Sequence, residues 1–237
     1  MKIEYFDKYD EMSKKAAEIV AEEVKAKPDA VLGLPTGSTP IGMYKNLIEK
    51  NKSGEIDLSK ITTFNLDEYY PIKKENEQSY YKFMSDNFFG SVNIDKNNIN
   101  IPNGEAPDAE LECINYEKKI EAGGNIDLMV IGLGPNGHIG FNEPGGFLIP
   151  DTHIADLTEA TKEANKRFFD SIDEVPEKAL TMGMGSILKS KKILLIISGE
   201  SKKAALKEFL AKEITTDLPV SFLHLHPDVT VLSDVKI

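Results

Sequence analysis

Residue types suited to proton transfer are concentrated in one short segment, 134–144. Asn136, His138 and Glu143 lie there among glycines, which permit tight turns. A histidine exchanges protons near neutral pH, and a carboxylate or amide beside it can hold its tautomer. The segment therefore predicts that His138 is an acid–base residue oriented by Glu143 and Asn136. The alternative is a structural histidine bonded to a loop carbonyl.

A pair of carboxylates, Asp67 and Glu68, follows the expected strand 61–66. Neighbouring side chains on an extended chain point in opposite directions, so only one of the two can face a given pocket. Asp67 directly follows Leu66, which is expected to be buried, and burial raises a carboxyl pKa toward the range of a general base. We therefore expect Asp67 to be the base. The alternative is that the pair simply begins a polar loop.

Glycine and hydroxyl residues at Gly37, Ser38 and Thr39 lie between an expected strand and an expected helix. Free backbone N–H groups at the start of a helix favour an anion, so this segment predicts a phosphate cradle. It is neither a G-x-G-x-x-G motif nor a Walker loop, so it does not indicate nucleotide binding. The alternative is an ordinary loop in which Thr39 caps the helix and Pro40 is its first residue.

Two cations are candidates for binding the same anion. Arg167 is the single arginine among the 28 basic residues, and its planar fork can hold a phosphate in a bidentate way that lysine cannot imitate. Lys203 follows Ser198 and Gly199 near the expected start of another helix. Both are predicted to contact a phosphate, with a surface salt bridge as the alternative for Arg167.

The elements that must position these residues alternate along the chain. Hydrophobic periodicity predicts helices at 12–24, after 40, and at 79–89, 109–122, 159–169 and 201–211, and strands at 29–35, 61–66, 126–134, 179–182, 192–198 and 220–224. This order predicts an α/β fold, a single-domain, Rossmann-like three-layer sandwich with a mostly parallel sheet covered by helices on both faces. Ligands of such sheets bind at the carboxyl ends of the strands. The Asn-rich stretch 93–104 is expected to be a surface connection.

Composition narrows the class of protein further. With 237 residues and 41% hydrophobic content, the chain is expected to form one domain, 1–237. Its net charge of -11 argues against nucleic acid as a partner. The longest aliphatic run, 193–197, is far shorter than the roughly 20 residues of a membrane helix. The N-terminus lacks the pattern of a secretory signal, so a cytoplasmic location is expected.

The remaining thiol and imidazole groups predict packing rather than chemistry. Cys113 is the single cysteine, so an intramolecular disulfide and a cysteine-based zinc site are excluded. His224 and His226 have the spacing of one strand face, but no clear carboxylate or cysteine set completes a zinc site around them. No metal is therefore expected, and His153 is assigned no role.

Five motifs, in order, resemble the glucosamine-6-phosphate deaminase family over nearly the whole chain. They are 34–40 (LPTGSTP), 64–69 (FNLDEY), 137–144 (GHIGFNEP), 165–169 (NKRFF) and 225–227 (LHP). The resemblance implies an enzyme of amino-sugar catabolism that converts glucosamine 6-phosphate and water to fructose 6-phosphate and ammonia. It also implies that neither a metal nor an organic cofactor is needed.

The resemblance further implies a role for each candidate residue. His138 would open the sugar ring, with Glu143 and Asn136 orienting it, and Asp67 would move a proton from C2 to C1. Some relatives have aspartate where this chain has Asn136, so Glu143 must supply the negative charge near the histidine. The phosphate would lie among Ser38, Thr39, Arg167 and Lys203.

Three other functions remain as alternatives. The first two are a galactosamine-6-phosphate deaminase/isomerase and a 6-phosphogluconolactonase, which has the same fold. The third is a non-catalytic sugar-phosphate sensor domain, although the chain has no basic helix-turn-helix. The chain ends at Ile237, before the longer C-terminal segment of hexameric, allosterically activated relatives. We therefore expect a monomer or small homo-oligomer without activation by N-acetylglucosamine 6-phosphate.

Overall fold

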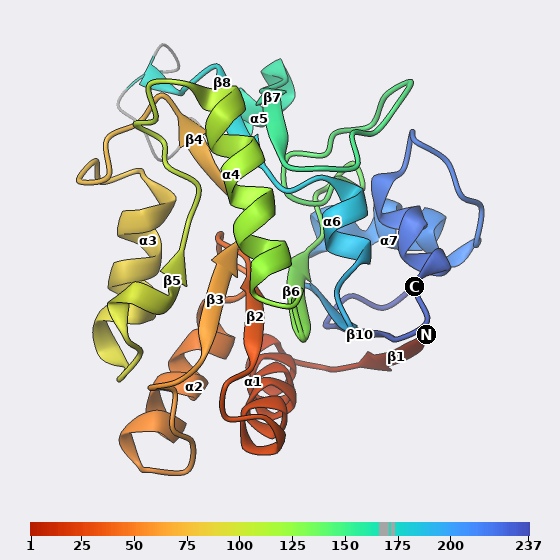
Figure 1. The fold of residues 1–237 in the computed structure, drawn as a ribbon. Helices are drawn as coiled ribbons and strands as arrows, with labels where there is room; N and C mark the ends of the chain where they lie inside the picture. Colours follow the sequence, from red (N-terminus) through yellow and green to blue (C-terminus); the bar gives the residue numbers. More distant parts are fainter. Residues whose placement is uncertain (166–170, 172–173) are drawn as a thin grey trace.

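Seven strands form a fully parallel central sheet in a computed structural model, which describes residues 1–165, 171 and 174–237 (Figure 1). Their order across the sheet is β1-β10-β9-β6-β2-β3-β5. The strands are β1 (Lys2–Tyr5), β2 (Val31–Leu34), β3 (Thr62–Asn65), β5 (Ile99–Asn100), β6 (Leu128–Gly132), β9 (Lys192–Ile197) and β10 (Val229–Ser233). Because all pairings are parallel, the carboxyl ends of these strands share one edge.

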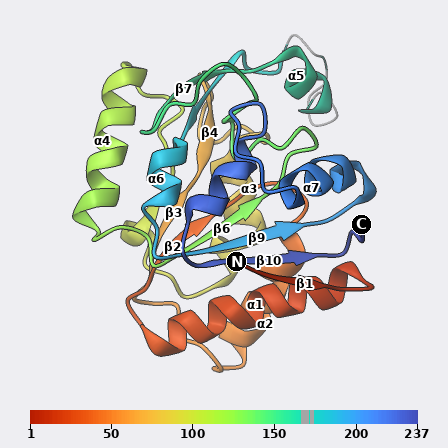
Figure 2. The same ribbon diagram turned by 90° about the vertical axis from the view of Figure 1, so that its right-hand side faces the viewer.

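Helices cover both faces of the central sheet, as the alternating pattern predicts (Figure 2). Leu128 and Val130 of β6 pack toward α1 and α2, whereas Met129 and Ile131 pack toward the opposite helices. This alternation follows from the two-residue period of a strand. The helices are α1 (Tyr9–Ala26), α2 (Ile41–Lys52), α3 (Tyr80–Asn87), α4 (Ala109–Ala122), α5 (Glu159–Asn165), α6 (Met184–Leu188) and α7 (Lys203–Leu210).

A second, antiparallel sheet has the order β4-β8-β7. Its strands are β4 (Asp67–Tyr70), β8 (Lys178–Thr181) and β7 (His153–Asp156). Asp67 lies opposite Thr181, which in turn lies opposite His153. The expected strand at 179–182 therefore exists but belongs to this smaller sheet. β4 and β7 were not expected from the sequence.

Two predictions about the chain after residue 90 are wrong. Residues 220–224 are not a strand but part of a 3-10 helix, Pro219–Leu225, in which Val220, Ser221 and Leu223 are buried without strict alternation. The strand at this end of the chain is β10, which follows that helix. The Asn-rich stretch is more than a connection, because its Ile99 pairs with Thr63 and makes β5 the edge strand.

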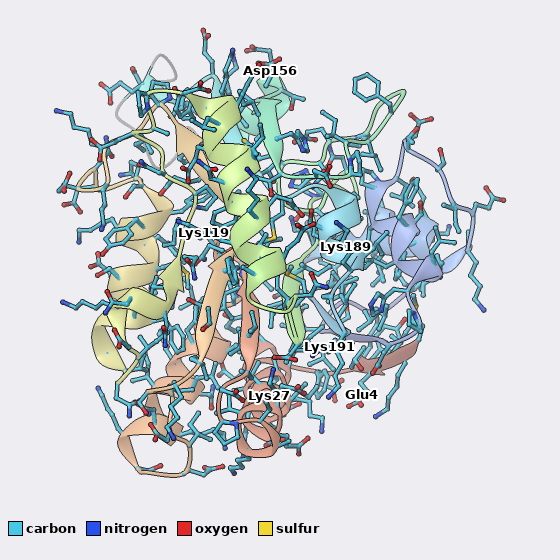
Figure 3. The ribbon with its side chains drawn as sticks, viewed as in Figure 1. Glu4, Lys27, Lys119, Asp156, Lys189 and Lys191 are labelled. Carbon is cyan, nitrogen blue, oxygen red and sulfur yellow. The ribbon has the colours of Figure 1, made fainter. Side chains whose placement is uncertain are left out.

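Polar contacts hold the amino ends of the strands, away from their carboxyl edge. Asp127, just before β6, is buried and accepts hydrogen bonds from the Lys27 and Lys191 ammonium groups at 2.6 and 2.7 Å and from the backbone N–H of Val31 at 2.8 Å. Figure 3 shows both lysines at this end of the molecule. Burial alone would raise the pKa of Asp127, but these hydrogen bonds outweigh it and lower the pKa.

The thiol and the C-terminal histidines are structural. Cys113 is buried, and burial raises the pKa of its thiol to about 11. The Nε2 atoms of His224 and His226 lie 2.8 Å from the carbonyl oxygens of Phe209 and Ser190 respectively. Within the described ranges, no group of three or more histidine, cysteine, aspartate or glutamate residues could hold a metal ion. No helix in the described part of the chain has the length and apolarity needed to span a membrane.

Candidate active site

A cleft of about 670 Å³ opens at the carboxyl edge of the central sheet. Residues from the loops after β2, β3, β6 and β9 line it, because parallel strands bring those loops to one edge. The lining includes Gly37, Ser38, Thr39, Asp67, Asn136 and His138. The structure therefore brings together the predicted base, the predicted histidine and the predicted phosphate cradle.

The imidazole of His138 packs directly over the backbone of Gly134. A Cβ atom at position 134 would lie 2.4 Å from three atoms of the His138 ring, so a side chain there would displace the imidazole. The Gly134 N–H donates to the His138 carbonyl at 2.9 Å, and the Gly137 N–H donates to the Gly134 carbonyl at 3.1 Å. Gly137 has φ = 87°, a conformation that favours glycine. The loop thus requires glycine at positions 134 and 137 to aim the histidine into the cleft.

Glu143 lies beside the Nδ1 atom of His138, with its Oε1 atom 3.5 Å away. Asn136 is placed differently from the expectation. Its amide donates to Glu143 Oε2 at 2.8 Å and its oxygen accepts the backbone N–H of His138 at 3.3 Å, so it holds the carboxylate and the loop rather than the ring. Glu143 is therefore the group that faces the imidazole.

Thr161 of α5 is a further member of this group. Its hydroxyl donates to Glu143 Oε1 at 2.6 Å and accepts a hydrogen bond from Thr158 at 3.0 Å. Burial opposes ionisation of Glu143, but the nearby imidazole and the hydrogen bonds from Thr161 and Asn136 outweigh it and lower the pKa to about 2. Glu143 is therefore a carboxylate at neutral pH, placed to stabilise a protonated His138.

The sequence held little sign of this role for Thr161. Its backbone N–H donates to the Thr158 hydroxyl at 3.2 Å, which is the local pattern of a helix cap. The spacing of the two threonines therefore indicates capping, and the contact with Glu143 arises only from tertiary packing.

Asp67 begins β4, lines the cleft and is only 7% exposed. Burial, with a smaller contribution from the neighbouring Glu68 carboxylate, raises the pKa of Asp67 to about 8. The loop after β6 passes close by, since a Cβ atom at Gly140 would lie 3.3 Å from Asp67 Oδ2 and 2.9 Å from Thr181 Oγ1. Asp67 therefore has the burial and the proton affinity of a general base that works near neutral pH.

Two aromatic side chains, Tyr80 and Phe141, also line the cleft. Their rings are parallel, with an interplanar angle of 1° and centroids 6.2 Å apart, and Tyr69 packs against both. Tyr80 comes from α3, which is distant in sequence from the loop of Phe141. Sequence reasoning missed this wall because a tyrosine at the start of a helix is not by itself a signal of function.

The alternative interpretation of the predicted phosphate cradle, in which Thr39 caps α2 and Pro40 is its first residue, does not match the structure. Pro40 occupies the N-cap position, and no side chain caps the helix. The Tyr9 hydroxyl of α1 instead donates to the carbonyls of Ser38 and Thr39 and accepts the backbone N–H of Gly42 at 2.8 Å. The Ser38 and Thr39 hydroxyls are therefore not used as helix caps.

The structure places Lys202, not Lys203, among the cleft residues. Lys203 is half-exposed, and its ammonium lies 3.8 Å from a carboxylate oxygen of Glu200. Consecutive residues of a helical segment point about 100° apart, so a one-residue difference moves the side chain to another face. Lys202 is thus the lysine that lines the cleft, and the phosphate contact of Lys203 stays a prediction. Arg167 lies outside the described residues, and its role stays a prediction.

The site as a whole can move protons at two separate places. His138, backed by an ionised Glu143, and Asp67, with its raised pKa, both line the cleft. Ser38, Thr39 and Lys202 line the same cleft, and their hydroxyl and ammonium groups are potential donors for an anion. Such an arrangement suits acid–base chemistry on a small phosphorylated molecule.

Comparisons with known proteins find similar sequences and similar solved structures. The chain is 56% identical to a glucosamine-6-phosphate deaminase of Thermoanaerobacter pseudethanolicus over 234 residues, which are 99% of this chain and 92% of that protein. A solved monomeric glucosamine-6-phosphate deaminase matches with a TM-score of 0.96 and 48% identity, covering 98% of this chain and 97% of the other.

A more distant likeness shows the fold alone. The 6-phosphogluconolactonase of Thermotoga maritima has a TM-score of 0.77 at 21% identity, over 98% of each chain. A family model described as glucosamine-6-phosphate isomerases/6-phosphogluconolactonase matches residues 7–232. The chain therefore belongs to the family of glucosamine-6-phosphate isomerases and 6-phosphogluconolactonases.

Proposed function

We propose that this chain is a glucosamine-6-phosphate deaminase, which converts glucosamine 6-phosphate and water to fructose 6-phosphate and ammonia. The observation that carries the proposal is the buried Asp67, a second acid–base group in the same cleft as His138. Ring opening needs one proton-transfer group at the anomeric oxygen, and isomerisation needs another at carbon. Two relatives with more than 50% identity over 234 residues carry this name.

In the first step, His138 takes the proton of the anomeric hydroxyl, and the pyranose ring opens to the aldehyde. The imidazolium then gives this proton to the ring oxygen as the bond between that oxygen and C1 breaks. Glu143 remains ionised and stabilises the imidazolium, because its pKa lies at about 2. Asn136 and Thr161 hold that carboxylate by the hydrogen bonds described above.

In the second step, ionised Asp67 removes the proton from C2 of the open-chain sugar. The C1=O double bond of the aldehyde is replaced by a C1=C2 double bond, which gives an enolamine. Asp67 then returns a proton to C1. The resulting C2 imine adds water, and ammonia leaves to give the ketose phosphate. A carboxyl group with a pKa of about 8 can act alternately as base and acid near neutral pH.

The phosphate of the substrate is proposed to bind at Ser38 and Thr39, with Lys202 as the cation in place of Lys203. Gly37 supports this cradle, because its φ of 93° favours glycine in the turn before the hydroxyl residues. Arg167 remains the predicted bidentate partner of the same phosphate.

The alternatives make different demands on these residues. A lactonase moves no C2 proton, so Asp67 would be dispensable in it. The substrate of a galactosamine-6-phosphate deaminase differs from glucosamine 6-phosphate only in the configuration at C4. Such an enzyme therefore requires the same acid–base groups. A sensor domain would bind the sugar phosphate and release no ammonia.

We further propose that the protein works in the cytoplasm as a monomer or a small homo-oligomer. The similar solved deaminase is described as monomeric, which supports the smaller assembly. Light scattering coupled to size-exclusion chromatography, at micromolar concentration with and without fructose 6-phosphate, tests it, and a hexamer would contradict it.

The decisive assay supplies purified protein with glucosamine 6-phosphate and galactosamine 6-phosphate in parallel and measures ammonia and ketose phosphate. We expect both products in equal amounts from the glucosamine substrate, also after treatment with a chelator. Absence of ammonia from both substrates would overturn the proposal. Ammonia from the galactosamine substrate alone would establish the epimer as the true substrate, and a separate lactone assay addresses the lactonase.

A further inference from the structure

One carboxylate near the C-terminus holds the turn that follows β9. Asp234 Oδ2 accepts the Ser198 hydroxyl at 2.6 Å, and Asp234 Oδ1 accepts the backbone N–H of Gly199 at 3.1 Å. The backbone N–H of Asp234 in turn donates to the Ile197 carbonyl at 3.2 Å. A single side chain beyond β10 is thus bonded to two successive residues of the turn.

That turn leads to Lys202. Gly199 has φ = 95°, in the region that favours glycine, and its carbonyl accepts the backbone N–H of Lys202 at 3.0 Å. Ser198, Ser201 and Lys202 all line the cleft, whereas Asp234 does not. The short helical turn 200–202 has no side-chain cap of its own. The direction in which Lys202 leaves the turn therefore depends on the conformation at Gly199, which Asp234 holds.

We propose that Asp234 is a positioning residue for phosphate binding, which keeps the turn after β9 in the conformation that aims Lys202 into the cleft. This inference rests on the proposed function, in which Lys202 binds the phosphate. Asp234 is not itself a ligand, since its negative charge would repel a phosphate. Its contribution is geometric, through one bond to a hydroxyl and one to a backbone N–H.

The geometric role makes asparagine a rescuing substitution at this position. An asparagine side chain has an oxygen that can accept the Gly199 N–H and an amide group that can donate to Ser198. It therefore retains both bonds while it removes the charge. Alanine removes both bonds, and glutamate keeps the charge but places the carboxylate one methylene further out.

The experiment measures binding of fructose 6-phosphate and of inorganic phosphate by calorimetry, together with kcat and KM for glucosamine 6-phosphate. We expect Asp234→Ala to weaken binding of both probes and to raise KM by about tenfold, with kcat within about twofold, because misplacement of one cation lowers affinity by that order. Asp234→Asn should stay within about threefold of the wild type. Lys236→Ala is the matched control, since Lys236 is two residues from Asp234 in the sequence, is exposed and pairs with Asp7.

Two results would overturn the inference: a folded Asp234→Ala variant with unchanged affinity for both probes, or Asp234→Asn as weak as Asp234→Ala. If Asp234→Ala does not fold, Asp234→Glu takes its place and is compared with Asp234→Asn. Equal affinities of these two variants for the probes would then contradict the inference. Failure of the proposed function can be told apart from failure of this inference. A wild type that releases no ammonia contradicts the proposed function, but its binding of the two probes can still be compared with that of the Asp234 variants. A wild type that deaminates, with KM unaltered by Asp234→Ala, contradicts the positioning role alone.

Discussion

Asp67 and Glu68 are consecutive in β4, and their carboxylates serve opposite faces of that strand. Asp67 lines the cleft, whereas Glu68 accepts the backbone N–H groups of Tyr69, Tyr80 and Tyr81 at 2.9, 2.8 and 2.9 Å. Glu68 therefore ties the start of α3 to β4 and places Tyr80 in the wall of the cleft. Burial raises the pKa of Glu68 to about 7, against opposing hydrogen bonds from those N–H groups. One carboxylate is thus an anchor, and the other is available for chemistry.

The pH dependence of kcat/KM should report the ionisation of Asp67. Only the carboxylate can remove the C2 proton, and the pKa of Asp67 lies at about 8, so kcat/KM should rise with pH and level off above about pH 8. Ammonia release measured from pH 6 to 9.5 checks this. An acidic limb near pH 4, the ordinary range of a carboxyl group, would contradict the raised pKa.

Asp67→Asn should abolish deamination and stabilise the protein at alkaline pH. The pKa of Asp67 is raised in the folded state, so its contribution to stability is full below about pH 4 and is lost as pH rises through about 8. Asparagine has no such loss, and we expect a gain on the order of 1–3 kcal/mol in the free energy of unfolding at pH 9. Thermal unfolding at pH 5 and pH 9 checks this, with the exposed Asp217→Asn as control. A lower melting temperature at pH 9 would refute it.

Thr161→Val should slow ring opening, because it removes the hydroxyl that donates to Glu143 at 2.6 Å. The pKa of Glu143 should rise, and kcat should fall by about tenfold, the order expected for losing a hydrogen bond to a charged group. Thr161→Ser keeps the hydroxyl and should restore most of the rate. Steady-state kinetics of the two variants decide the point, and equal rates would exclude a role for the hydroxyl.

Lys202→Ala and Lys203→Ala form a matched pair that tests which lysine contacts the phosphate. Lys202 lines the cleft, and Lys203 lies beside Glu200 instead. We expect Lys202→Ala to raise KM about tenfold or more and Lys203→Ala to leave it within about twofold, since loss of a phosphate contact weakens binding. The opposite order would restore the assignment made from the sequence.

Gly134→Ala should damage the site without destroying the fold. A Cβ atom there would lie 2.4 Å from the His138 ring, and the imidazole must move to accept it. We expect kcat to fall by about two orders of magnitude, because a displaced acid–base group loses most of its effect. Gly146→Ala is the control, since a Cβ at 146 meets no atom within 4 Å. Equal activity of both variants would show that the ring position is not critical.

The sequence was most informative where one local signal dominates. The helix predicted at 109–122 has those same bounds in α4, where the Asp108 side chain accepts the backbone N–H of Leu111 as an N-cap. The run at 126–134, apolar from Leu128 onward, contains β6, which is buried on both faces. The hydrophobic pattern predicted the wrong element at 220–224. Residue types that favour a strand form a 3-10 helix there, which begins at Pro219. There the apolar residues indicate burial but not the backbone conformation.

The sequence by itself determined the α/β fold, the family, and the roles of Asp67, His138 and Glu143 as candidates. These depend on residue type, local periodicity and direct succession along the chain, all of which are present in the sequence. Only the tertiary structure decided that Lys202 faces the cleft, that Thr161 and Asn136 hold Glu143, and that Asp234 holds the turn after β9. Those contacts join residues that different elements bring together, and side-chain direction there depends on packing that no local pattern records.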